Sequence, residues 1–310
     1  MSYLYKLAGE KLEMAEADLR GFLRSQELDD EIVRNKRIAE TEVEPLQIRR
    51  LAYTHEVCEK IVEKDLDEDI DHEAEGSYAV RAVNIGDTDH DTQEWERRIG
   101  GELENDENEV DLDHPENEFR VYLFNDFYIL GELVEKLPRD KFKERENQKR
   151  PFSSPVSIDP VQARFLVNLA EVRPGKKVLD PFCGTGGILI EAGLCGVGVH
   201  GTDIQKKMVE GTRENLEEYG VIAHDIRKLD VEDAVDEFEE DFEAIITDLP
   251  YGKASFKESD VKEDFMELLD KKCSGKAVFV SDQSEFQSMT PEFSIYVHKN
   301  LTRYIYTYSS

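Results

Sequence analysis

The chain has 310 residues, of which 70 are Asp or Glu and 39 are Lys or Arg, so its formal net charge is −31. This length provides for about two domains with a substantial buried core. No apolar run approaches the roughly 18 residues of a membrane span, and no secretory signal opens the chain. We therefore expect a cytoplasmic protein that does not associate with a membrane. The four cysteines form no C-x-x-C pair, which favours reduced thiols over disulfides.

The excess of acidic residues also limits the partners. In dilute solution a net charge of −31 argues against a polyanionic substrate, because like charges suppress encounter. In molar salt, however, the Debye length falls to about 3 Å and surface carboxylates are largely screened. The acidic excess is spread through both halves of the chain, so we favour a halophilic surface, which predicts loss of structure at low salt.

The N-terminal residues 1–138 mix strands and helices without a βαβ repeat, which predicts an α+β domain. Apolar residues at helical spacing predict helices at 12–23, 51–62 and 95–99. Alternating or apolar runs predict strands at 3–7, 78–84, 119–124 and 127–130. The last two strands flank Asn125-Asp126, which tolerate the left-handed turn of a hairpin.

Two acidic runs interrupt this region, at residues 65–75 and 105–117. Both are too acidic to pack, so we expect exposed loops. The first run lacks the glycine and the ligand spacing of a calcium loop, and we predict no metal site there.

Residues 139–158 are expected to link two domains. Residues 139–150 carry six basic and three acidic side chains, a local net of +3, and two prolines follow. Such a run is usually only exposed to solvent. Its basic side chains could, however, also contact a phosphate of a nucleic-acid backbone. Asp159 and Pro160 then suit the N-cap and first position of a helix, so the second domain is predicted to span 159–310.

From residue 177 onward, strands and helices alternate, which is the pattern of a mostly parallel, doubly wound sheet. Strands are predicted at 177–180, 197–203, 221–224, 244–248 and 276–281, and a helix at 205–219. A final hairpin of residues 293–298 and 301–308 adds an antiparallel edge strand. We therefore predict an α/β, Rossmann-like domain preceded by an α+β region.

The first strand of this domain leads into Asp180-Pro-Phe-Cys-Gly-Thr-Gly-Gly187, a glycine turn before a helix. Its glycines let the backbone approach a ligand closely where a Cβ would clash. A dinucleotide fingerprint would need a third glycine at Leu189, and Asp180 would repel a pyrophosphate. The sulfonium and amino groups of S-adenosylmethionine are cationic, so this cofactor suits the carboxylate better.

Further acids follow the next two strands. Asp203 ends the second strand, where an acid can accept both ribose hydroxyls, and Ile204 beside it is assigned to the same cofactor site. Asp225 follows the third strand and could accept the adenine amino group, or it could simply be solvated. Cys183 is expected to be a small side chain in a tight turn; a catalytic thiolate is the alternative, but the sequence places no base beside it.

The second motif, Asp248-Leu-Pro-Tyr-Gly252, follows a strand at the same edge of the sheet. An exocyclic amine on a nucleobase is a poor nucleophile, because its lone pair is delocalised into the ring. Hydrogen bonds to the Asp248 carboxylate and to a carbonyl held rigid by Pro250 would orient that lone pair, and Tyr251 would stack on the base. The motif resembles the [Asp/Asn]-Pro-Pro-[Tyr/Phe] signature of amino-methyltransferases, from which Leu249 departs.

Each motif alone is more often a structural turn or loop, but the two in this order, with Asp203 between them, predict a methyltransferase. The whole chain resembles the archaeal THUMP-domain tRNA methyltransferases, and most of all the tRNA guanine-10 N2-methyltransferase and dimethyltransferase family. The matching stretches, besides the two motifs, are Arg50-Leu-Ala-Tyr-Thr-His55, Tyr78-Ala-Val-Arg81, Val110-Asp-Leu and Arg150-Pro-Phe-Ser-Ser-Pro155.

The resemblance implies a ferredoxin-like element and a THUMP domain in residues 1–138, which grip the acceptor end of tRNA. It also implies that the glycine turn and Asp203 bind S-adenosylmethionine, and that Asp248, Pro250 and Tyr251 hold the guanine N2 amine. We expect a monomer with tRNA as its partner.

Other substrates fit the same motifs. The target could be another guanine of tRNA, or an amine of ribosomal RNA, of DNA adenine (N6) or of a glutamine side chain. From a different class, the chain could be a catalytically idle RNA-binding module, although the intact Asp180 and Asp248 argue against this. Every methyltransferase interpretation requires these two carboxylates to flank one crevice.

Overall fold

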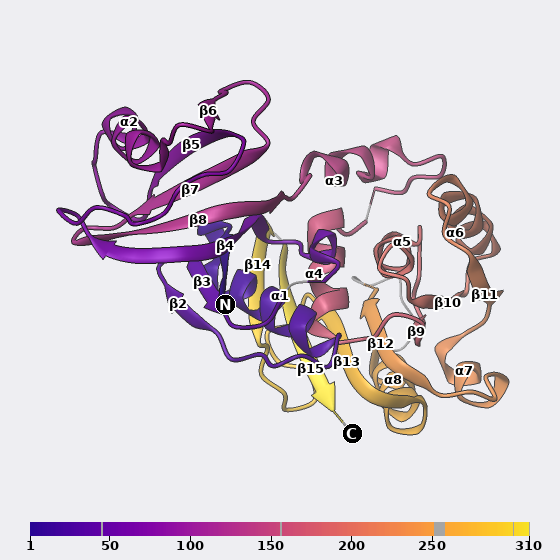
Figure 1. Cartoon of the computed structure of the whole chain (residues 1–310). Helices are drawn as coiled ribbons and strands as arrows, with labels where there is room; N and C mark the ends of the chain where they lie inside the picture. Colours follow the sequence, from indigo (N-terminus) through magenta and orange to yellow (C-terminus); the bar gives the residue numbers. More distant parts are fainter. Residues whose placement is uncertain (45, 156, 251–257, 300, 310) are drawn as a thin grey trace. The chain divides into compact units, whose positions relative to one another are not determined.

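The computed structural model describes residues 1–44, 46–155, 157–250, 258–299 and 301–309, with the backbone alone at 258–260 (Figure 1). The chain divides into two compact units. Unit 1 comprises Met1–Glu16, Asp29–Arg49 and Tyr53–Pro138. Unit 2 comprises Ala17–Leu28, Arg50–Ala52 and Arg139–Ser310.

Unit 1 is built on one eight-stranded sheet with the order β2-β3-β1-β4-β8-β7-β5-β6. Its neighbouring strands are antiparallel except for the pairs of β5 with β6 and with β7, which are parallel. The elements of the N-terminal half are β1 (Tyr3–Leu7), η1 (Gly9–Lys11), α1 (Leu12–Arg24), β2 (Val33–Asn35), β3 (Ile38–Thr41), η2 (Ile48–Arg50), β4 (Thr54–Asp65), β5 (Ser77–Asn84), α2 (Thr92–Leu103), β6 (Glu109–Val110), β7 (Asn117–Leu123) and β8 (Phe127–Lys136). The expected hairpin is confirmed, because the amide of Phe124 donates to the carbonyl of Phe127 across the two-residue turn.

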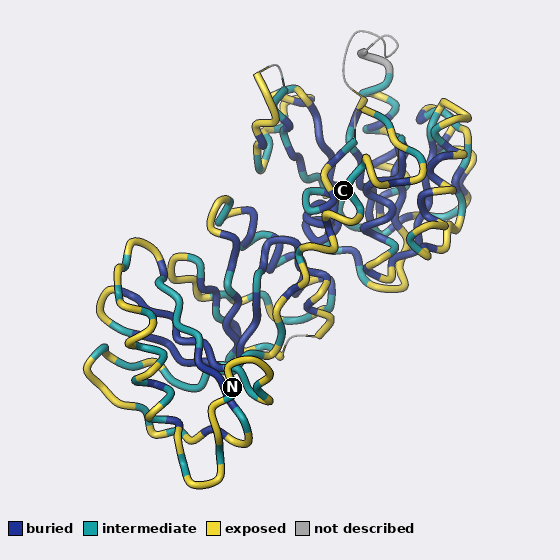
Figure 2. Tube along the Cα trace, turned by 90° about the horizontal axis from the view of Figure 1, so that it is seen from above, coloured by how far each residue is buried: buried dark blue, intermediate teal, exposed yellow. Residues whose placement is uncertain are grey.

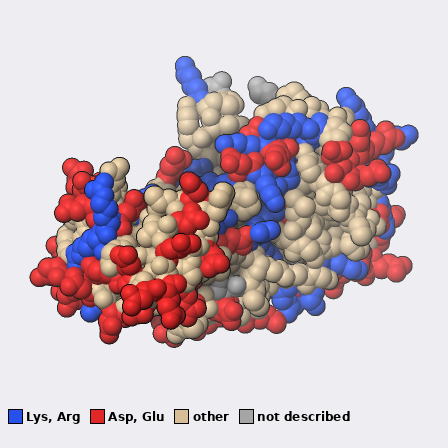
Figure 3. All heavy atoms as spheres, turned by 45° about the horizontal axis from the view of Figure 1, so that its top comes forward, with Lys and Arg blue, Asp and Glu red and all other residues tan. Residues whose placement is uncertain are grey.

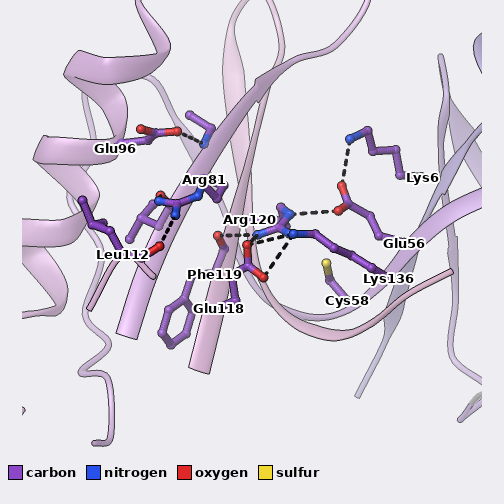
Figure 4. A network of polar contacts seen from close by, with 12 residues as sticks. Lys6, Glu56, Cys58, Arg81, Glu96, Leu112, Glu118, Phe119, Arg120 and Lys136 are labelled. Carbon is purple, nitrogen blue, oxygen red and sulfur yellow. Dashed lines mark hydrogen bonds and ion pairs between the residues drawn. The ribbon is translucent and has the colours of Figure 1, made fainter. Parts of the chain in front are cut away.

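The predicted helix at 51–62 is wrong, since β4 occupies most of that range. β4 pairs with β1 on one side and β8 on the other, so its residues are held in the sheet whatever their spacing. A buried acid also disguises the alternation of the strand. Glu56 is buried and accepts hydrogen bonds from Lys6 and Arg120, at 2.9 Å each, as Figure 4 shows. A charged residue at a buried position interrupts the alternation of apolar and polar residues by which a strand is recognised in the sequence.

Unit 2 contains a seven-stranded sheet with the order β11-β10-β9-β12-β13-β15-β14. The first five strands are parallel, and β15 and β14 are antiparallel, which confirms the doubly wound sheet with a terminal hairpin. Helices α4, α5 and α6 pack in sequence on one face of the sheet and α7 with α8 on the other (Figure 1). The elements are α3 (Asp140–Glu144), η3 (Asn147–Lys149), α4 (Pro160–Leu169), β9 (Lys177–Asp180), α5 (Gly187–Gly193), β10 (Gly198–Asp203), α6 (Lys206–Glu218), β11 (Ala223–Lys228), α7 (Val231–Glu237), β12 (Phe242–Asp248), α8 (Glu258–Lys272), β13 (Cys273–Ser281), β14 (Phe293–His298) and β15 (Leu301–Ser309).

A buried polar cluster explains why two short N-terminal segments belong to unit 2. The Asn168 side chain donates to Asp18 at 2.7 Å and accepts from Arg50 at 2.7 Å. Asp18 in turn accepts from the amide of Ala52 at 2.8 Å. Because these groups are buried, each needs its partner, and the cluster fixes residues 17–28 and 50–52 to α4.

Residues 139–158, which we expect to link two domains, are part of unit 2 and contain two short helices. Of the six bases in this run, Arg145 pairs with Glu191 at 2.6 Å and Arg150 is buried. These two side chains are therefore occupied inside the protein. The helix start after the run is confirmed, because the Asp159 side chain accepts from the amides of Val161 and Gln162.

Figure 2 shows buried residues along the inner runs of the chain and many exposed residues at the bends of the trace. All four cysteines are buried and free, as expected for reduced thiols. Within the described ranges, the chain has no helix with the length and apolar character needed to cross a membrane.

Candidate active site

Two carboxylates stand at the ends of neighbouring parallel strands of unit 2. β9 pairs directly with β12, with Val178 opposite Ala244 and Leu179 opposite Ile245, so Asp180 and Asp248 end adjacent strands at one edge of the sheet. Both line one pocket, which confirms the geometric requirement stated above. The residues lining it are Ser157, Ile158, Asp180, Phe182, Cys183, Gly184, Thr185, Gly187, Ile188, Asp248, Leu249 and Pro250.

Asp180 is a buried carboxylate at the end of β9. It is only 2% exposed, and its Oδ1 accepts from the Thr247 hydroxyl at 2.6 Å and the Phe182 amide at 3.1 Å. Burial raises the pKa of Asp180 to about 7 against these two hydrogen bonds, and the charges of Asp248 and Asp203 add to the rise. A cationic ligand beside Asp180 would compensate this buried charge.

The glycine turn that follows has the backbone that its sequence predicts. Gly184 and Gly186 have φ of 51° and 77°, in the left-handed region that favours glycine. A Cβ at Gly186 would also lie 2.9 Å from Cγ2 of Thr212. The turn is held by Thr212, which donates to the carbonyl of Gly184 at 2.8 Å, and by Thr202, which donates to the carbonyl of Pro181 at 3.0 Å.

Asp203 lies next to this turn at the end of β10. Its carboxylate accepts from the amides of Gly184 at 3.2 Å and Gln205 at 2.8 Å, and burial raises its pKa. The following residue, Ile204, is 42% exposed. The Asp203 carboxylate is suited to accept hydrogen bonds from ribose hydroxyls. The exposed side chain of Ile204 is suited to pack against an adenine ring.

The expected position of Asp225 is wrong. β11 begins at Ala223 rather than 221 and continues to Lys228, so Asp225 lies inside the strand, opposite His200, and not after its end. Its carboxylate pairs with the Arg227 guanidinium two residues further along the same strand. Asp225 does not line the pocket described above.

Asp248 is placed by an anchored loop. The amide of Leu249 donates to the carbonyl of Val280 at 3.0 Å, and the Leu249 side chain is buried in the core cluster of α7, α8 and β12. Proline at this position could not donate that hydrogen bond, so the departure from the Pro-Pro signature is compensated by a different anchor. Pro250 lines the pocket, whereas Tyr251 lies outside the described residues.

An arginine from the C-terminal hairpin completes the surroundings of Asp248. Burial raises the pKa of Asp248 to about 7, the Arg303 guanidinium opposes this rise, and Asp282 adds to it. Nη2 of Arg303 lies 3.5 Å from Oδ2 of Asp248. Asp248 can thus change its charge near neutral pH, as an acceptor for an amine proton must.

Sequence reasoning missed the residues that support the glycine turn. Asn215 of α6 donates to the carbonyls of Phe152 and Thr185, at 2.8 Å each, and accepts from the Phe152 amide at 2.9 Å. Nη1 of Arg150 donates to the hydroxyl of Ser157 at 3.1 Å and reaches Thr185 at 3.4 Å. The sequence signal for these contacts is the Arg150-Pro-Phe-Ser-Ser-Pro155 stretch, whose Arg150 and Phe152 contact Thr185 and Asn215 beside the glycine turn.

Cys183 is a packed side chain in the glycine turn. It is buried, and burial raises its pKa well above the usual range of a thiol. Its Sγ lies 3.8 Å from the Thr212 hydroxyl. Burial and the raised pKa thus argue against the alternative of a catalytic thiolate.

Comparison with known proteins agrees with this geometry. Residues 147–302 match the family described as RMKL-like, methyltransferase domain. The chain is 36% identical to the tRNA (guanine(10)-N2)-dimethyltransferase of Methanothermobacter thermautotrophicus and 32% identical to that of Methanocaldococcus jannaschii, in both cases over 98% of each chain. The crystal structure of TrmN from Thermus thermophilus is similar in fold, with a TM-score of 0.53 at 19% identity over 99% of each chain. The chain therefore belongs to the family of archaeal tRNA (guanine(10)-N2)-dimethyltransferases, and its residues 147–302, within unit 2, form an RMKL-like methyltransferase domain.

Proposed function

We propose that this protein transfers methyl groups from S-adenosylmethionine to the N2 amine of guanine 10 in tRNA, giving N2-methylguanosine and then N2,N2-dimethylguanosine. One observation carries the chemistry: Asp180 and Asp248 end adjacent strands and line one pocket. The names and nearly full-length similarity of the two archaeal relatives support the substrate.

The chain's own groups suit the cofactor. We assign its binding to the buried Asp180, to Pro181, Phe182, Cys183, Gly184, Thr185, Gly186 and Gly187 of the turn, and to Asp203 and Ile204. Asp225 joins this set only if its carboxylate leaves Arg227. When bound, S-adenosylmethionine supplies an electrophilic methyl group on a sulfonium.

The second motif prepares the amine. The Asp248 carboxylate and the backbone carbonyl at Leu249 can accept the two amine protons, which leaves the N2 lone pair directed out of the base plane. As the N–C bond forms, the bond between the methyl carbon and the sulfonium would break, with S-adenosylhomocysteine as the leaving group, and the nitrogen becomes cationic so that its proton becomes acidic. Asp248, whose pKa is raised to about 7, can take that proton and pass it to solvent. Tyr251 is proposed to stack on the base.

We further propose that unit 1 binds the tRNA, as the THUMP resemblance implies. The two archaeal relatives match over 98% of the chain, so their similarity includes unit 1. A chain of charge −31 can bind a polyanion only where salt screens its surface, so binding should be measured in molar KCl.

Tritiated methyl transfer to tRNA transcripts in molar KCl tests the proposal. The wild-type protein should label a transcript with guanine at position 10 and not one with adenine there, and nucleoside mass spectrometry should find both products. Asp248→Ala should lower the rate at least about 100-fold while keeping cofactor affinity. Cofactor binding without any methyl transfer would instead favour another amine substrate, and no cofactor binding would favour the idle RNA-binding module.

A further inference from the structure

Arg303 is a buried cation with incomplete hydrogen bonding beside the proposed catalytic carboxylate. It is 6% exposed. Its Nη2 lies 3.5 Å from both Oδ2 of Asp248 and the Ser157 carbonyl, and its Nη1 lies 3.4 Å from Oε1 of Gln162. Within the described part of the chain, its Nε has no partner. Charge-assisted hydrogen bonds are normally about 2.7–2.9 Å, so this guanidinium has donor capacity to spare.

The antiparallel hairpin delivers this side chain to the catalytic edge. Asp248 is in register with Val280 of β13, and the next residue, Ser281, is in register with Tyr304 of β15. Because β15 runs the opposite way, Arg303 lies one position further toward the edge where Asp248 ends. Arg303 does not itself line the pocket, but its guanidinium contacts two residues that do, Ser157 and Asp248, so it lies directly behind the pocket lining.

The pair Asp248 and Arg303 offers two acceptors followed by a donor. The Watson–Crick edge of guanine carries the complementary row: the N2 amine donor, the N1–H donor and the O6 acceptor. Adenine carries an amine and then an unprotonated N1, whose lone pair would face the Asp248 carboxylate. A site with polar groups matched to one base rejects a base that leaves them unpaired.

We propose that Arg303 determines the specificity for guanine by donating to O6, while Asp248 accepts the N2 and N1 protons. This rests on the proposed function and names a recognition residue for it. Arg303 also has a positioning role, because its positive charge opposes the rise in the pKa of Asp248 and so favours the ionised acceptor that both guanine donors require.

The test compares two bases at the target position of a synthetic tRNA. 2-Aminopurine keeps the N2 amine but lacks O6 and the N1 proton. Wild-type kcat/KM should favour guanine over 2-aminopurine by about 100-fold or more. Arg303→Gln should lower kcat/KM for guanine about 10- to 100-fold and leave that for 2-aminopurine within about threefold, so the preference collapses. Because loss of Arg303 should raise the pKa of Asp248, both proteins are assayed over a pH series and compared where each rate has levelled off.

Arg173→Gln is the matched control. It removes one positive charge from the same unit, but Arg173 pairs with Glu243 at the opposite end of β12 from Asp248. Its preference for guanine should equal that of the wild type. A cofactor titration shows whether Arg303→Gln is folded, and Arg303→Lys, which keeps the charge without the planar fork, should retain a reduced preference.

The outcomes separate the two proposals. If the wild type does not methylate the guanine transcript, the proposed function fails and this inference with it. If it does, but Arg303→Gln retains the wild-type preference, only the role of Arg303 fails. A wild-type preference below about threefold overturns that role without reference to any variant.

Discussion

Asp180 and Asp248 share a residue type and a pKa raised to about 7, but the groups around them differ. Asp180 accepts hydrogen bonds from a hydroxyl and a backbone amide. Asp248 instead lies beside the guanidinium of Arg303. The first environment fixes an anion where a cationic ligand can compensate it. The second places a guanidinium beside the carboxylate that we propose contacts the amine. Neutralising each side chain should therefore affect different properties.

Asp180→Asn should raise the thermal midpoint of the cofactor-free protein at pH 8 and weaken S-adenosylmethionine binding at least about tenfold. The folded pKa lies above the unfolded value of about 4, so this group costs stability as pH rises from about 4 through about 7. An amide avoids that cost, at most about 4 kcal/mol, and its oxygen can still accept from Thr247 and Phe182. Thermal unfolding and calorimetric titration measure both effects; a lower midpoint at pH 8 would contradict the assignment.

Methyl transfer at saturating cofactor should rise with pH through about 7 and then level off, because Asp248 must be ionised to accept the amine. The measurement is the single-turnover rate between pH 5.5 and 9 in molar KCl, with circular dichroism to confirm folding at each pH. Asp248→Asn should be slow and show no rise near pH 7. A wild-type rate that is flat across this range would exclude Asp248 as the titrating group.

At the scale of elements, the glycine turn before α5 joins backbone conformation to ligand binding. Gly186→Ala must place a Cβ at positive φ and 2.9 Å from Thr212, so we expect a loss of about 2–4 kcal/mol in stability and of most cofactor affinity. Gly220 also has positive φ, 66°, but a Cβ there would meet nothing within 4 Å. Gly220→Ala is therefore the control, with a cost of about 1 kcal/mol and unchanged cofactor affinity. Chemical denaturation and cofactor titration compare the two, and equal losses of affinity would contradict a special role for Gly186.

The elements of unit 2 could be predicted because their strands are apolar runs that end at acids or glycines. The parallel strands β9, β10 and β12 and the turn after β9 follow directly from such runs. The predicted position of β11 was too early in the chain, because Ile226 is the one buried residue of this strand and no apolar run marks its limits. In unit 1, β4 was misread as a helix because two partner strands impose extended backbone on a segment with a buried Glu56.

The supporting residues of the site could not be predicted in the same way. Arg150, Asn215 and Arg303 come from a loop, a helix and a hairpin strand that are far apart in the chain. Each contacts the site through one side chain, and no periodic pattern of apolar residues in the sequence predicts such a contact. Motif spacing therefore locates the groups proposed to touch cofactor and base, and folding adds the groups that hold them.

At the scale of the whole molecule, the acidic surface leads us to propose that the fold is stable only where salt screens its charges. Acidic side chains crowd much of the face shown in Figure 3, while basic ones gather in smaller groups. With 70 acidic and 39 basic residues, the folded chain concentrates like charges that the unfolded chain would separate.

Stability should accordingly rise steeply between dilute buffer and about 1 M KCl, where the Debye length falls to about 3 Å, and less steeply beyond it. We expect the thermal midpoint to increase by roughly 10 °C or more over the first interval. Calorimetry across a KCl series measures this, with sucrose as an uncharged control that should not reproduce the early rise. The same midpoint in dilute buffer and in molar KCl would refute the halophilic interpretation.

The anchoring of Leu249 has a practical consequence for redesign. A protein engineer who corrected this loop toward the double-proline form would remove the donor to Val280 and vacate the space that the leucine fills. Leu249→Pro should thus impair folding and turnover together, instead of stiffening the loop. Leu249 departs from the double-proline pattern, yet its hydrogen bond and its packing hold the loop that positions the Asp248 carboxylate.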